Sequence, residues 1–251
     1  MDTNNKSVYG LLGYPLGHSF SLNYFIEKFE SEKINAEYVN FEIPEIDFFM
    51  EILSENPDLK GLNVTIPYKE LVIPYMDELD IDAQEIGAVN VIKIAFKDGD
   101  LWLKGYNSDV IGFTNSIKPL LLPADKNALV LGTGGASKAI CYGLRKMGMK
   151  VTSVSRTKTD LTITYDELNE EIIRNNSVIV NTTPLGMFPN VDTCPSIPYN
   201  LLNENHLCYD LVYNPEETLF LKNASKNGAR IKNGFEMLLL QANASWEIWN
   251  K

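Results

Sequence analysis

A short apolar run that leads into glycines and then into a helical pattern constrains the fold of this chain most. The run is Ala128–Leu131, and an amphipathic pattern follows over Ser137–Met147. A buried strand, a tight glycine turn and a helix in this order are typical of a Rossmann-type unit, whose turn holds a dinucleotide pyrophosphate at the helix N-terminus. The expected cofactor loop comprises Gly132, Thr133, Gly134, Gly135 and Ala136. Ser137 stands where the usual fingerprint has glycine, and a purely structural turn is the alternative.

The next strand pattern, Val151–Ser155, ends in basic residues. Enzymes selective for NAD carry a carboxylate roughly 20 residues past the glycines, where it binds the ribose 2′-hydroxyl. A guanidinium and an ammonium stand here instead, and a planar fork of donors suits a 2′-phosphate. We therefore expect NADP rather than NAD, with an ordinary basic strand end as the alternative. The residues concerned are Ser155, Arg156, Thr157 and Lys158.

Strand and helix patterns alternate along the whole chain, which favours βαβ units in an α/β fold. The strands expected before the glycine loop are Val8–Gly13, Ala36–Ile43, Leu59–Ile66, Ala88–Ala95 and Leu101–Lys104. Helices are expected at Leu22–Lys33, Asp47–Asn56, Ile111–Leu122 and Phe235–Trp249. Later strands are expected at Ser177–Asn181, His206–Val212 and Ala229–Ile231. The break between the two series predicts two α/β domains, with the cleft between them as the default site.

Composition limits the partners of this chain. A net charge of −11 over 251 residues argues against nucleic acid and anionic membranes, whose phosphates would be repelled. Cys141, Cys194 and Cys208 show no metal-ligand spacing, and we predict no metal site. Reduced thiols, a polar start and no apolar run of membrane-spanning length favour the cytoplasm. The pattern leaves the choice between monomer and homodimer open.

A lysine follows the strand pattern that ends in Asn63–Ile66. Pro67 is expected to pass the chain into a short helix that carries Lys69. Strand C-termini of α/β sheets face the ligand crevice, where an ammonium beside a carboxylate can donate and recover a proton. A solvated lysine at the surface is the alternative.

Four motifs of the first half, read together, resemble the shikimate dehydrogenase family, and the resemblance extends over nearly the whole chain. They are Gly17–Ser21, Asn63–Lys69, Gly87–Asn90 and Gly105–Asp109. Leu22 replaces a proline of the family, and Ser108 stands where threonine is commoner. The resemblance implies that Lys69 and Asp109 are catalytic. It also implies substrate binding by Ser19, Ser21, Thr65, Asn90 and Asp109. Helix caps or turns are the alternatives for Ser21, Asn90 and Asp109.

Three motifs of the second half extend the resemblance. Thr183, in Asn181–Met187, would lie beside the nicotinamide ribose. Tyr213 would face the substrate, while Leu211 and Gly234 would lie near the cofactor. Gln241 would touch the substrate. A polar residue on an apolar helix is the alternative for Gln241, and an aromatic at a strand end is the alternative for Tyr213.

The resemblance implies a reaction and a domain layout. The reaction is the reversible reduction of 3-dehydroshikimate to shikimate by NADPH. Residues 1–105 with about 235–251 would form the substrate domain, because the C-terminal helix of the family returns to it, and 106–234 would form the NADP-binding domain. Quinate or dual quinate/shikimate dehydrogenases, a non-catalytic ligand sensor, and a methylenetetrahydrofolate-type dehydrogenase of similar layout are the alternatives.

Overall fold

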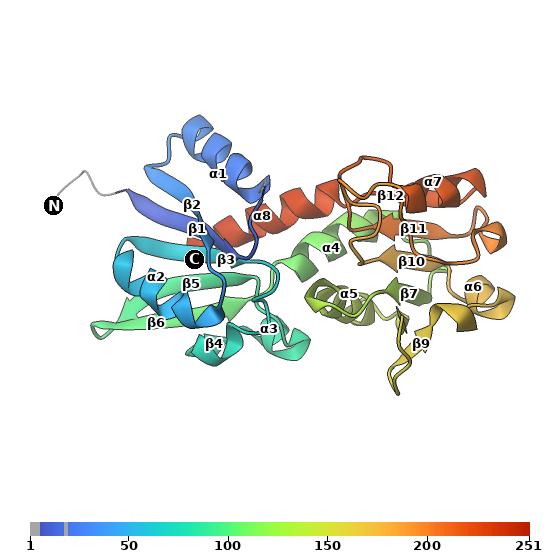
Figure 1. Ribbon diagram of the computed structural model, residues 1–251, viewed down its shortest axis with the longest axis horizontal. Coiled ribbons are helices and arrows are strands. Elements are labelled where there is room, and N and C mark those ends of the chain that lie inside the picture. Colours follow the sequence, from blue (N-terminus) through green and yellow to red (C-terminus); the bar gives the residue numbers. More distant parts are fainter. Residues whose placement is uncertain (1–5, 18–19) are drawn as a thin grey trace. The chain divides into compact units, whose positions relative to one another are not determined.

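The computed structural model describes residues 6–17 and 20–251. The chain divides into two compact units, of which unit 1 comprises Met1–Ser108 with Ala242–Lys251 and unit 2 comprises Asp109–Gln241 (Figure 1). The boundaries expected from the sequence lie after residue 105 and near residue 235. The second observed boundary falls inside helix α8 (Phe235–Trp249), because this helix is continuous and its two halves pack in different units.

Unit 1 contains a mixed sheet of the order β2-β1-β3-β5-β6-β4. Strand β1 pairs in parallel with β2 and β3, whereas β5 pairs antiparallel with β3 and with β6. The last of these pairs is the hairpin that the turn signal Lys97–Asp100 predicts. The strands are β1 (Ser7–Gly13), β2 (Ala36–Glu42), β3 (Leu59–Val64), β4 (Glu78–Leu79), β5 (Val91–Lys97) and β6 (Asp100–Tyr106).

Each face of the unit 1 sheet carries a buried cluster, and successive side chains of β1 contribute to one or the other because they point to opposite faces. On β1, Leu12 packs in a cluster with Phe49 and Leu62, while Tyr9 packs in another with Phe25. The helices of unit 1 are α1 (Phe20–Ser31), α2 (Phe49–Glu55), α3 (Ile81–Ile86) and the last part of α8.

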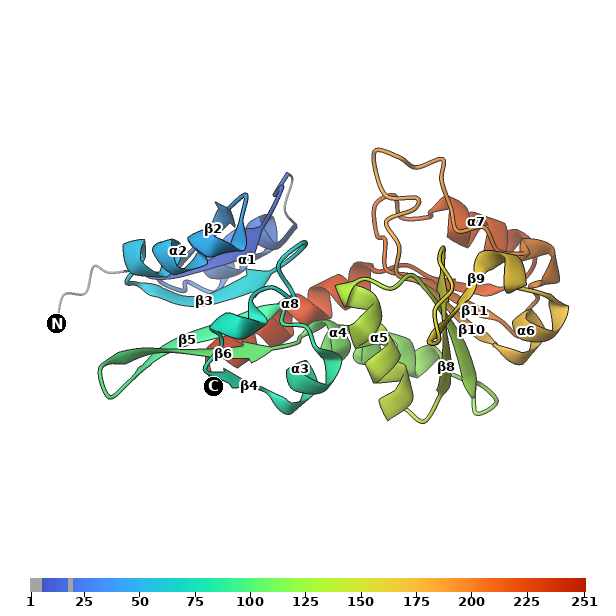
Figure 2. The same ribbon diagram turned by 60° about the horizontal axis from the view of Figure 1, so that its bottom comes forward.

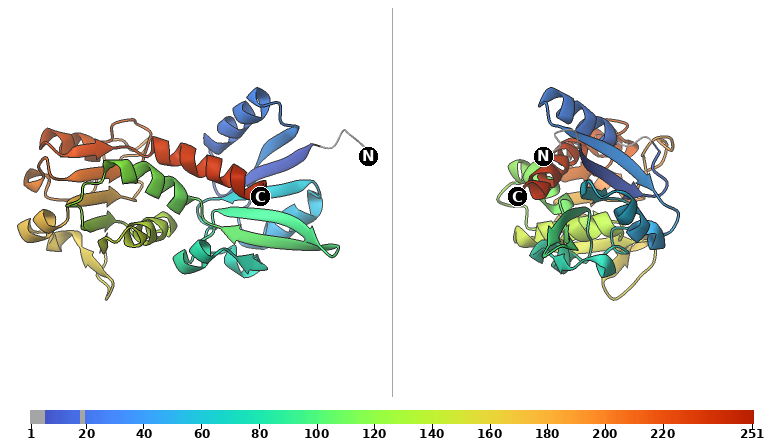
Figure 3. Two further views of the ribbon diagram at one scale, coloured as in Figure 1. Left: turned by 180° about the vertical axis from the view of Figure 1, so that it is seen from behind. Right: turned by 90° about the vertical axis from the view of Figure 1, so that its left-hand side faces the viewer.

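Trp249 anchors the end of α8 in unit 1. Its indole Nε1 donates to the carbonyl oxygen of Ile92 over 3.1 Å, and its ring occupies the space that a side chain at Gly61 would need. The ring also packs against Tyr9, with 4.9 Å between centroids. The expectation that the C-terminal helix returns to the first domain is therefore confirmed, and Figure 3 shows the unbroken course of this helix.

Unit 2 contains a fully parallel sheet of the order β12-β11-β10-β7-β8-β9 (Figure 1). Figure 2 shows the same unit from another side. Ala128 and Val130 of β7 pack in the cluster on one face, and Leu129 and Leu131 pack in the cluster on the other. The strands are β7 (Asn127–Leu131), β8 (Lys150–Ser155), β9 (Thr162–Thr164), β10 (Val178–Asn181), β11 (Leu207–Asp210) and β12 (Arg230–Lys232). The helices are α4 (Asp109–Ile117), α5 (Gly135–Lys146), α6 (Glu170–Asn175), α7 (Leu219–Lys226) and the first part of α8. A parallel sheet with helices on both faces confirms the predicted Rossmann-type fold.

Short 3₁₀ helices complete the fold, and they are η1 (Ile46–Phe48), η2 (Ile73–Tyr75), η3 (Lys118–Leu120), η4 (Tyr165–Glu167) and η5 (Tyr199–Leu201). The prediction that a short helix carries Lys69 is wrong, because residues 66–72 form consecutive turns. The carbonyl of Lys69 accepts the N–H of Val89 over 2.7 Å. This long-range bond takes an acceptor that a local helix would need. Among the described residues, no helix is long and apolar enough to cross a membrane.

The anchoring of Trp249 predicts a large loss of stability on truncation. Trp249→Ala should lower the free energy of unfolding by about 3–5 kcal/mol, because it leaves a cavity beside the unit 1 sheet and removes a buried hydrogen bond. Urea unfolding followed by circular dichroism measures the loss. The matched control is Trp102→Ala on β6, where the ring is only partly buried and the loss should be less than half as large. Equal losses in the two variants would contradict the anchoring role.

Candidate active site

Backbone hydrogen bonds fix the position of Lys69 at the end of β3. The N–H of Thr65 donates to the carbonyl of Leu12 over 2.9 Å, which continues the pairing with β1 beyond the last strand residue. The Lys69 carbonyl is held by Val89, and the carbonyl of Asn90 accepts the N–H of Val64 over 2.8 Å. Thr65 and Lys69 therefore lie on one backbone segment, which is hydrogen-bonded to the segment of Asn90. The side chain of Lys69 is half-buried.

Asn90 is buried and holds the segment that precedes Asp109. Its Oδ1 accepts the backbone N–H of Ser108 over 2.6 Å, and its Nδ2 donates to the Ser108 hydroxyl over 3.1 Å. Asn107 adds a bond from its Nδ2 to the carbonyl of Ala88 over 2.9 Å. Asp109 follows as the first residue of α4, a position where the helix dipole favours a carboxylate. Its side chain is buried.

The loop after β1 lies beside Thr65. The N–H of Tyr14 donates to the carbonyl of Ile66 over 3.1 Å, and the methyl group of Thr65 leaves no room for a side chain at Gly13. Ser21 lies in the first turn of α1, directly after its first residue, and is partly buried. Ser19, the other serine predicted to bind the substrate carboxylate, lies outside the described residues.

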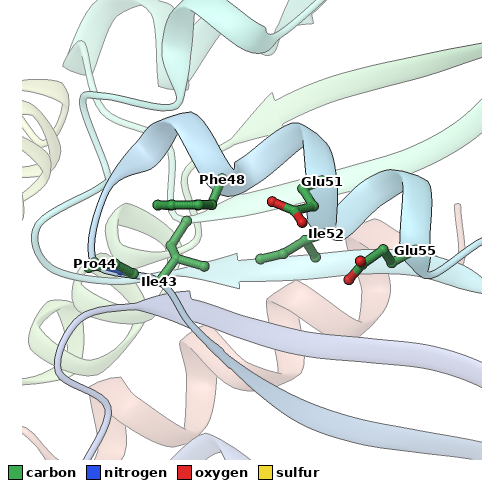
Figure 4. A pocket seen from close by; sticks show the side chains of 6 residues that line it. All are labelled: Ile43, Pro44, Phe48, Glu51, Ile52 and Glu55. Atoms are coloured by element: carbon green, nitrogen blue, oxygen red, sulfur yellow. The ribbon is translucent and has the colours of Figure 1, made fainter.

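A shallow pocket of unit 1 lies elsewhere, over α2 and the end of β2 (Figure 4). Its volume is about 220 Å³, and its lining combines apolar side chains with two carboxylates. The lining residues are Ile43, Pro44, Phe48, Glu51, Ile52 and Glu55. None of them belongs to the site predicted from the sequence.

The glycine loop of unit 2 follows β7 at the carboxyl edge of the parallel sheet. Gly132 has φ = +111°, and a Cβ there would come within 2.7 Å of the Thr182 hydroxyl oxygen. Gly134 precedes α5, and no side-chain hydrogen bond caps this helix. Thr133 and Gly134 are exposed, while Gly135 and Ala136 form the first turn of α5 and are partly buried. The N–H groups of this turn therefore have the arrangement that binds a phosphate.

Ser137 has a structural role in this loop. It is buried, and its hydroxyl donates to the carbonyl of Gly132 over 2.7 Å. Ser137 occupies the position where the usual fingerprint has a third glycine, and its hydrogen bond joins the two ends of the glycine turn. The serine is therefore compatible with a tight turn.

The basic residues after β8 differ in their partners. Lys158 forms an ion pair with Glu167, and this pair lowers the pKa of the Glu167 carboxyl. Burial raises the pKa of Tyr165, and the charge of Arg156 opposes that rise. Arg156 is exposed, and the Ser155 hydroxyl accepts the N–H of Thr157 over 3.3 Å. Of the two cations, Arg156 is the better candidate for a phosphate.

A buried carboxylate, Asp210, connects the loops that follow β10 and β11. Its Oδ1 accepts from Asn181 Nδ2 over 2.9 Å and from the N–H of Val212 over 3.0 Å. Its Oδ2 accepts from the Thr218 hydroxyl over 2.5 Å. Asn181 in turn accepts the N–H and the hydroxyl of Thr183 over 3.0 and 2.7 Å. The sequence predicted no role in the site for Asp210 and Asn181. Each is a polar residue at the end of an apolar strand, and this position could have indicated a role.

The remaining residues predicted in unit 2 lie on two further segments. Gly234 donates its N–H to the carbonyl of Val212 over 3.2 Å, and the Leu211 backbone leaves no room for a side chain at Gly234. Tyr213 is half-buried, and burial raises the pKa of its hydroxyl. Gln241 donates from Nε2 to the carbonyl of Leu238 over 3.1 Å. The described residues contain no group of His, Cys, Asp and Glu side chains that could hold a metal ion.

The burial of Asp210 predicts a pH-dependent stability. Desolvation raises the pKa of its carboxyl to about 6, although the three donors oppose the rise. A raised folded-state pKa stabilises the fold fully below the unfolded-state pKa, and this contribution is lost as the pH rises through 6. Asp210→Asn should remove the dependence, because an amide resembles the protonated carboxyl. Relative to this variant, the wild type should lose on the order of 1 kcal/mol between about pH 5 and about pH 7 in urea unfolding. A difference that stays constant or grows with pH would contradict the assignment.

Comparison with known proteins places the chain in a family. Residues 11–92 match the model of the shikimate dehydrogenase substrate binding domain. The shikimate dehydrogenase (NADP(+)) of Methanococcus maripaludis is 38% identical over 99% of this chain and 92% of its own length. The crystal structure of the Aquifex aeolicus shikimate dehydrogenase has a TM-score of 0.84 at 36% identity, covering 98% of this chain and 92% of that one. The Thermus thermophilus shikimate 5-dehydrogenase, solved with NADP(H) and shikimate, has a TM-score of 0.84 at 29% identity, covering 96% and 92%. The chain belongs to the shikimate dehydrogenase family.

Proposed function

We propose that this chain is an NADP-dependent shikimate dehydrogenase that reduces 3-dehydroshikimate reversibly to shikimate. The observation that carries the proposal is the bonded arrangement of the segments of Thr65, Lys69 and Asn90 at the end of β3. The relatives from Methanococcus maripaludis and Thermus thermophilus support the substrate and the cofactor. Aromatic amino-acid biosynthesis through chorismate is the pathway that uses this reaction.

In this proposal, NADPH supplies the hydride that adds to the carbonyl carbon of the substrate. Lys69 protonates the oxygen that becomes negatively charged, and in the reverse direction it accepts the proton of the hydroxyl group. Asp109 keeps the ammonium oriented and exchanges a proton with it. The backbone bond at the Lys69 carbonyl supports this role, because it fixes the root of the flexible side chain before the substrate binds.

Separate groups bind the rest of the substrate. Ser19 and Ser21 bind its carboxylate, and the remaining residues bind the ring hydroxyls or face the ring. These are Thr65, Asn90, Asp109, Tyr213 and Gln241.

The cofactor is assigned to the carboxyl edge of the unit 2 sheet. The loop Gly132–Ala136 would hold the pyrophosphate, and Arg156 would bind the 2′-phosphate with smaller contributions from Ser155, Thr157 and Lys158. Thr183, Leu211 and Gly234 would hold the nicotinamide end. The fixed backbone of these loops supports the assignment. The enzyme works in the cytoplasm, as a monomer or a homodimer, and its three free thiols are compatible with that compartment.

Quinate is the competing substrate within the family. It differs from shikimate in its saturated ring and in a further hydroxyl at the carbon that bears the carboxylate. Parallel assays with shikimate and quinate, each with NADP and NAD, separate the two activities. Turnover of quinate with NAD in preference to shikimate with NADP would refute the proposal.

Lys69→Ala should lower turnover by about 10²–10⁴, the range for loss of a general acid. The rate is followed by the absorbance of NADPH at about 340 nm with shikimate and NADP, because hydride transfer creates that chromophore. The binding of NADPH should be unchanged. Lys60→Ala, an exposed lysine of β3, is the matched control and should keep full turnover. Full turnover of Lys69→Ala would show that this amine does not transfer the proton.

Arg156→Ala should raise the KM for NADPH by roughly 10-fold or more, because a charge-assisted hydrogen bond to the 2′-phosphate contributes about 1.5–3 kcal/mol. The KM for NADH should hardly change, so the preference for NADPH narrows. Arg174→Ala, an exposed arginine of α6, is the control and should leave both constants unchanged. An unchanged ratio of the two constants in Arg156→Ala would remove the argument for the 2′-phosphate site.

A further inference from the structure

A continuous chain of hydrogen bonds runs through the interior of unit 1, from α1 to the segment before α4. Its first measured bond is that of the Tyr38 hydroxyl, and a side-chain hydrogen bond from Ser21 opposes the rise in the pKa of Tyr38. Tyr38 donates to Asn63 Oδ1 over 2.8 Å, and Asn63 Nδ2 donates to the Ser245 hydroxyl over 2.8 Å. Ser245 is buried on α8, in the part that belongs to unit 1.

The chain continues from Ser245 to Asn90. The hydroxyl oxygens of Ser245 and Ser108 lie 3.2 Å apart. Ser108 receives Asn90 Nδ2 and gives its backbone N–H to Asn90 Oδ1. Asn63 lies close to the same segment, since its Nδ2 is 3.5 Å from the carbonyl of Asn90. The two ends of the chain are therefore Ser21 and Asn90, and both residues are proposed to bind the substrate.

A single direction of donation can be drawn from Tyr38 to Ser108, and Ser108 and Asn90 exchange hydrogen bonds at the end of the chain. Ser21 can donate to Tyr38, Tyr38 donates to Asn63, and the amide of Asn63 passes the polarity on to Ser245. Ser245 can then donate to Ser108, whose proton has Asn90 Oδ1 at 3.3 Å as its acceptor. The hydroxyl groups of Tyr38, Ser245 and Ser108 thus each have both an acceptor and a donor. In a buried setting this strongly favours one set of rotamers, because an unpaired polar group there costs about 1–3 kcal/mol.

We propose that Tyr38 and Ser245 are positioning residues for the substrate, which hold Ser21 and Asn90 in their binding rotamers through this hydrogen-bond chain. The inference rests on the proposed function, since it takes Ser21 and Asn90 as groups that bind the carboxylate and a ring hydroxyl. It gives the unit 1 part of α8 a role in substrate binding in addition to the packing of Trp249. Burial raises the pKa of Tyr38 well above its ordinary value, so the hydroxyl remains a donor over the working pH range.

The test uses variants that remove one hydroxyl group and little else. Tyr38→Phe keeps the ring, which stacks on Phe25 with 4.6 Å between centroids, and Ser245→Ala removes a single oxygen. Each variant should raise the KM for shikimate by roughly 3- to 10-fold, the range for loss of one hydrogen bond. The KM for NADP should stay unchanged. The double variant should raise the KM by less than the product of the single effects, because both substitutions break the same chain.

The matched control is Tyr209→Phe in unit 2, where a buried tyrosine hydroxyl lies 2.6 Å from the Ser116 hydroxyl. It should lose similar stability in urea and keep its KM for shikimate. The inference would be overturned if Tyr38→Phe left the KM for shikimate unchanged or raised the KM for NADP equally. It would also be overturned if the two substitutions acted independently in the double variant. Ser21→Ala and Asn90→Ala test the proposed function separately. If these two raise the KM and Tyr38→Phe does not, the substrate site stands and only the positioning role fails.

Discussion

The hydrogen bond from the Val89 N–H to the Lys69 carbonyl is the constraint on which the proposed chemistry depends. It joins the turns after β3 to the segment that carries Asn90 and so holds the backbone of the lysine there. Asn90 in turn binds both the backbone and the hydroxyl of Ser108, the residue before Asp109. Fixing the backbone of a flexible side chain lowers the entropy that the reactive geometry would otherwise cost.

In unit 2, a buried carboxylate fixes the backbone of loops in a comparable way. The loops after β7, β10 and β11 end at one edge of the parallel sheet, and loops at this edge are free to vary. Asp210 binds Asn181, Val212 and Thr218 at once, and Ser137 closes the glycine turn from inside. Buried polar groups whose hydrogen bonds are all satisfied favour a single arrangement of the loops, and the proposed cofactor site requires such an arrangement.

Local sequence patterns predicted the fold well, but they did not predict the long-range hydrogen bonds that hold the residues of the proposed site. The strand, glycine turn and helix around Gly132 could be recognised because apolar runs and glycines are local signals. The turns that carry Lys69 could not be predicted, because the Lys69 carbonyl is hydrogen-bonded to Val89, a residue far away in the sequence. Ser245 resembles any polar residue on an apolar helix, and only its contact with Asn63 reveals its burial. The short helices α3 and α6 were missed since six residues give too little periodicity.

The most direct test of the central claim is turnover by the unmodified chain. Purified protein with shikimate and NADP should produce NADPH at a rate that rises to saturation in both compounds, and 3-dehydroshikimate with NADPH should run the reaction back. The rate with NADP should exceed that with NAD. Binding of both compounds without any hydride transfer in either direction would contradict the account, because the proposed site would then lack the proton donor assigned to Lys69.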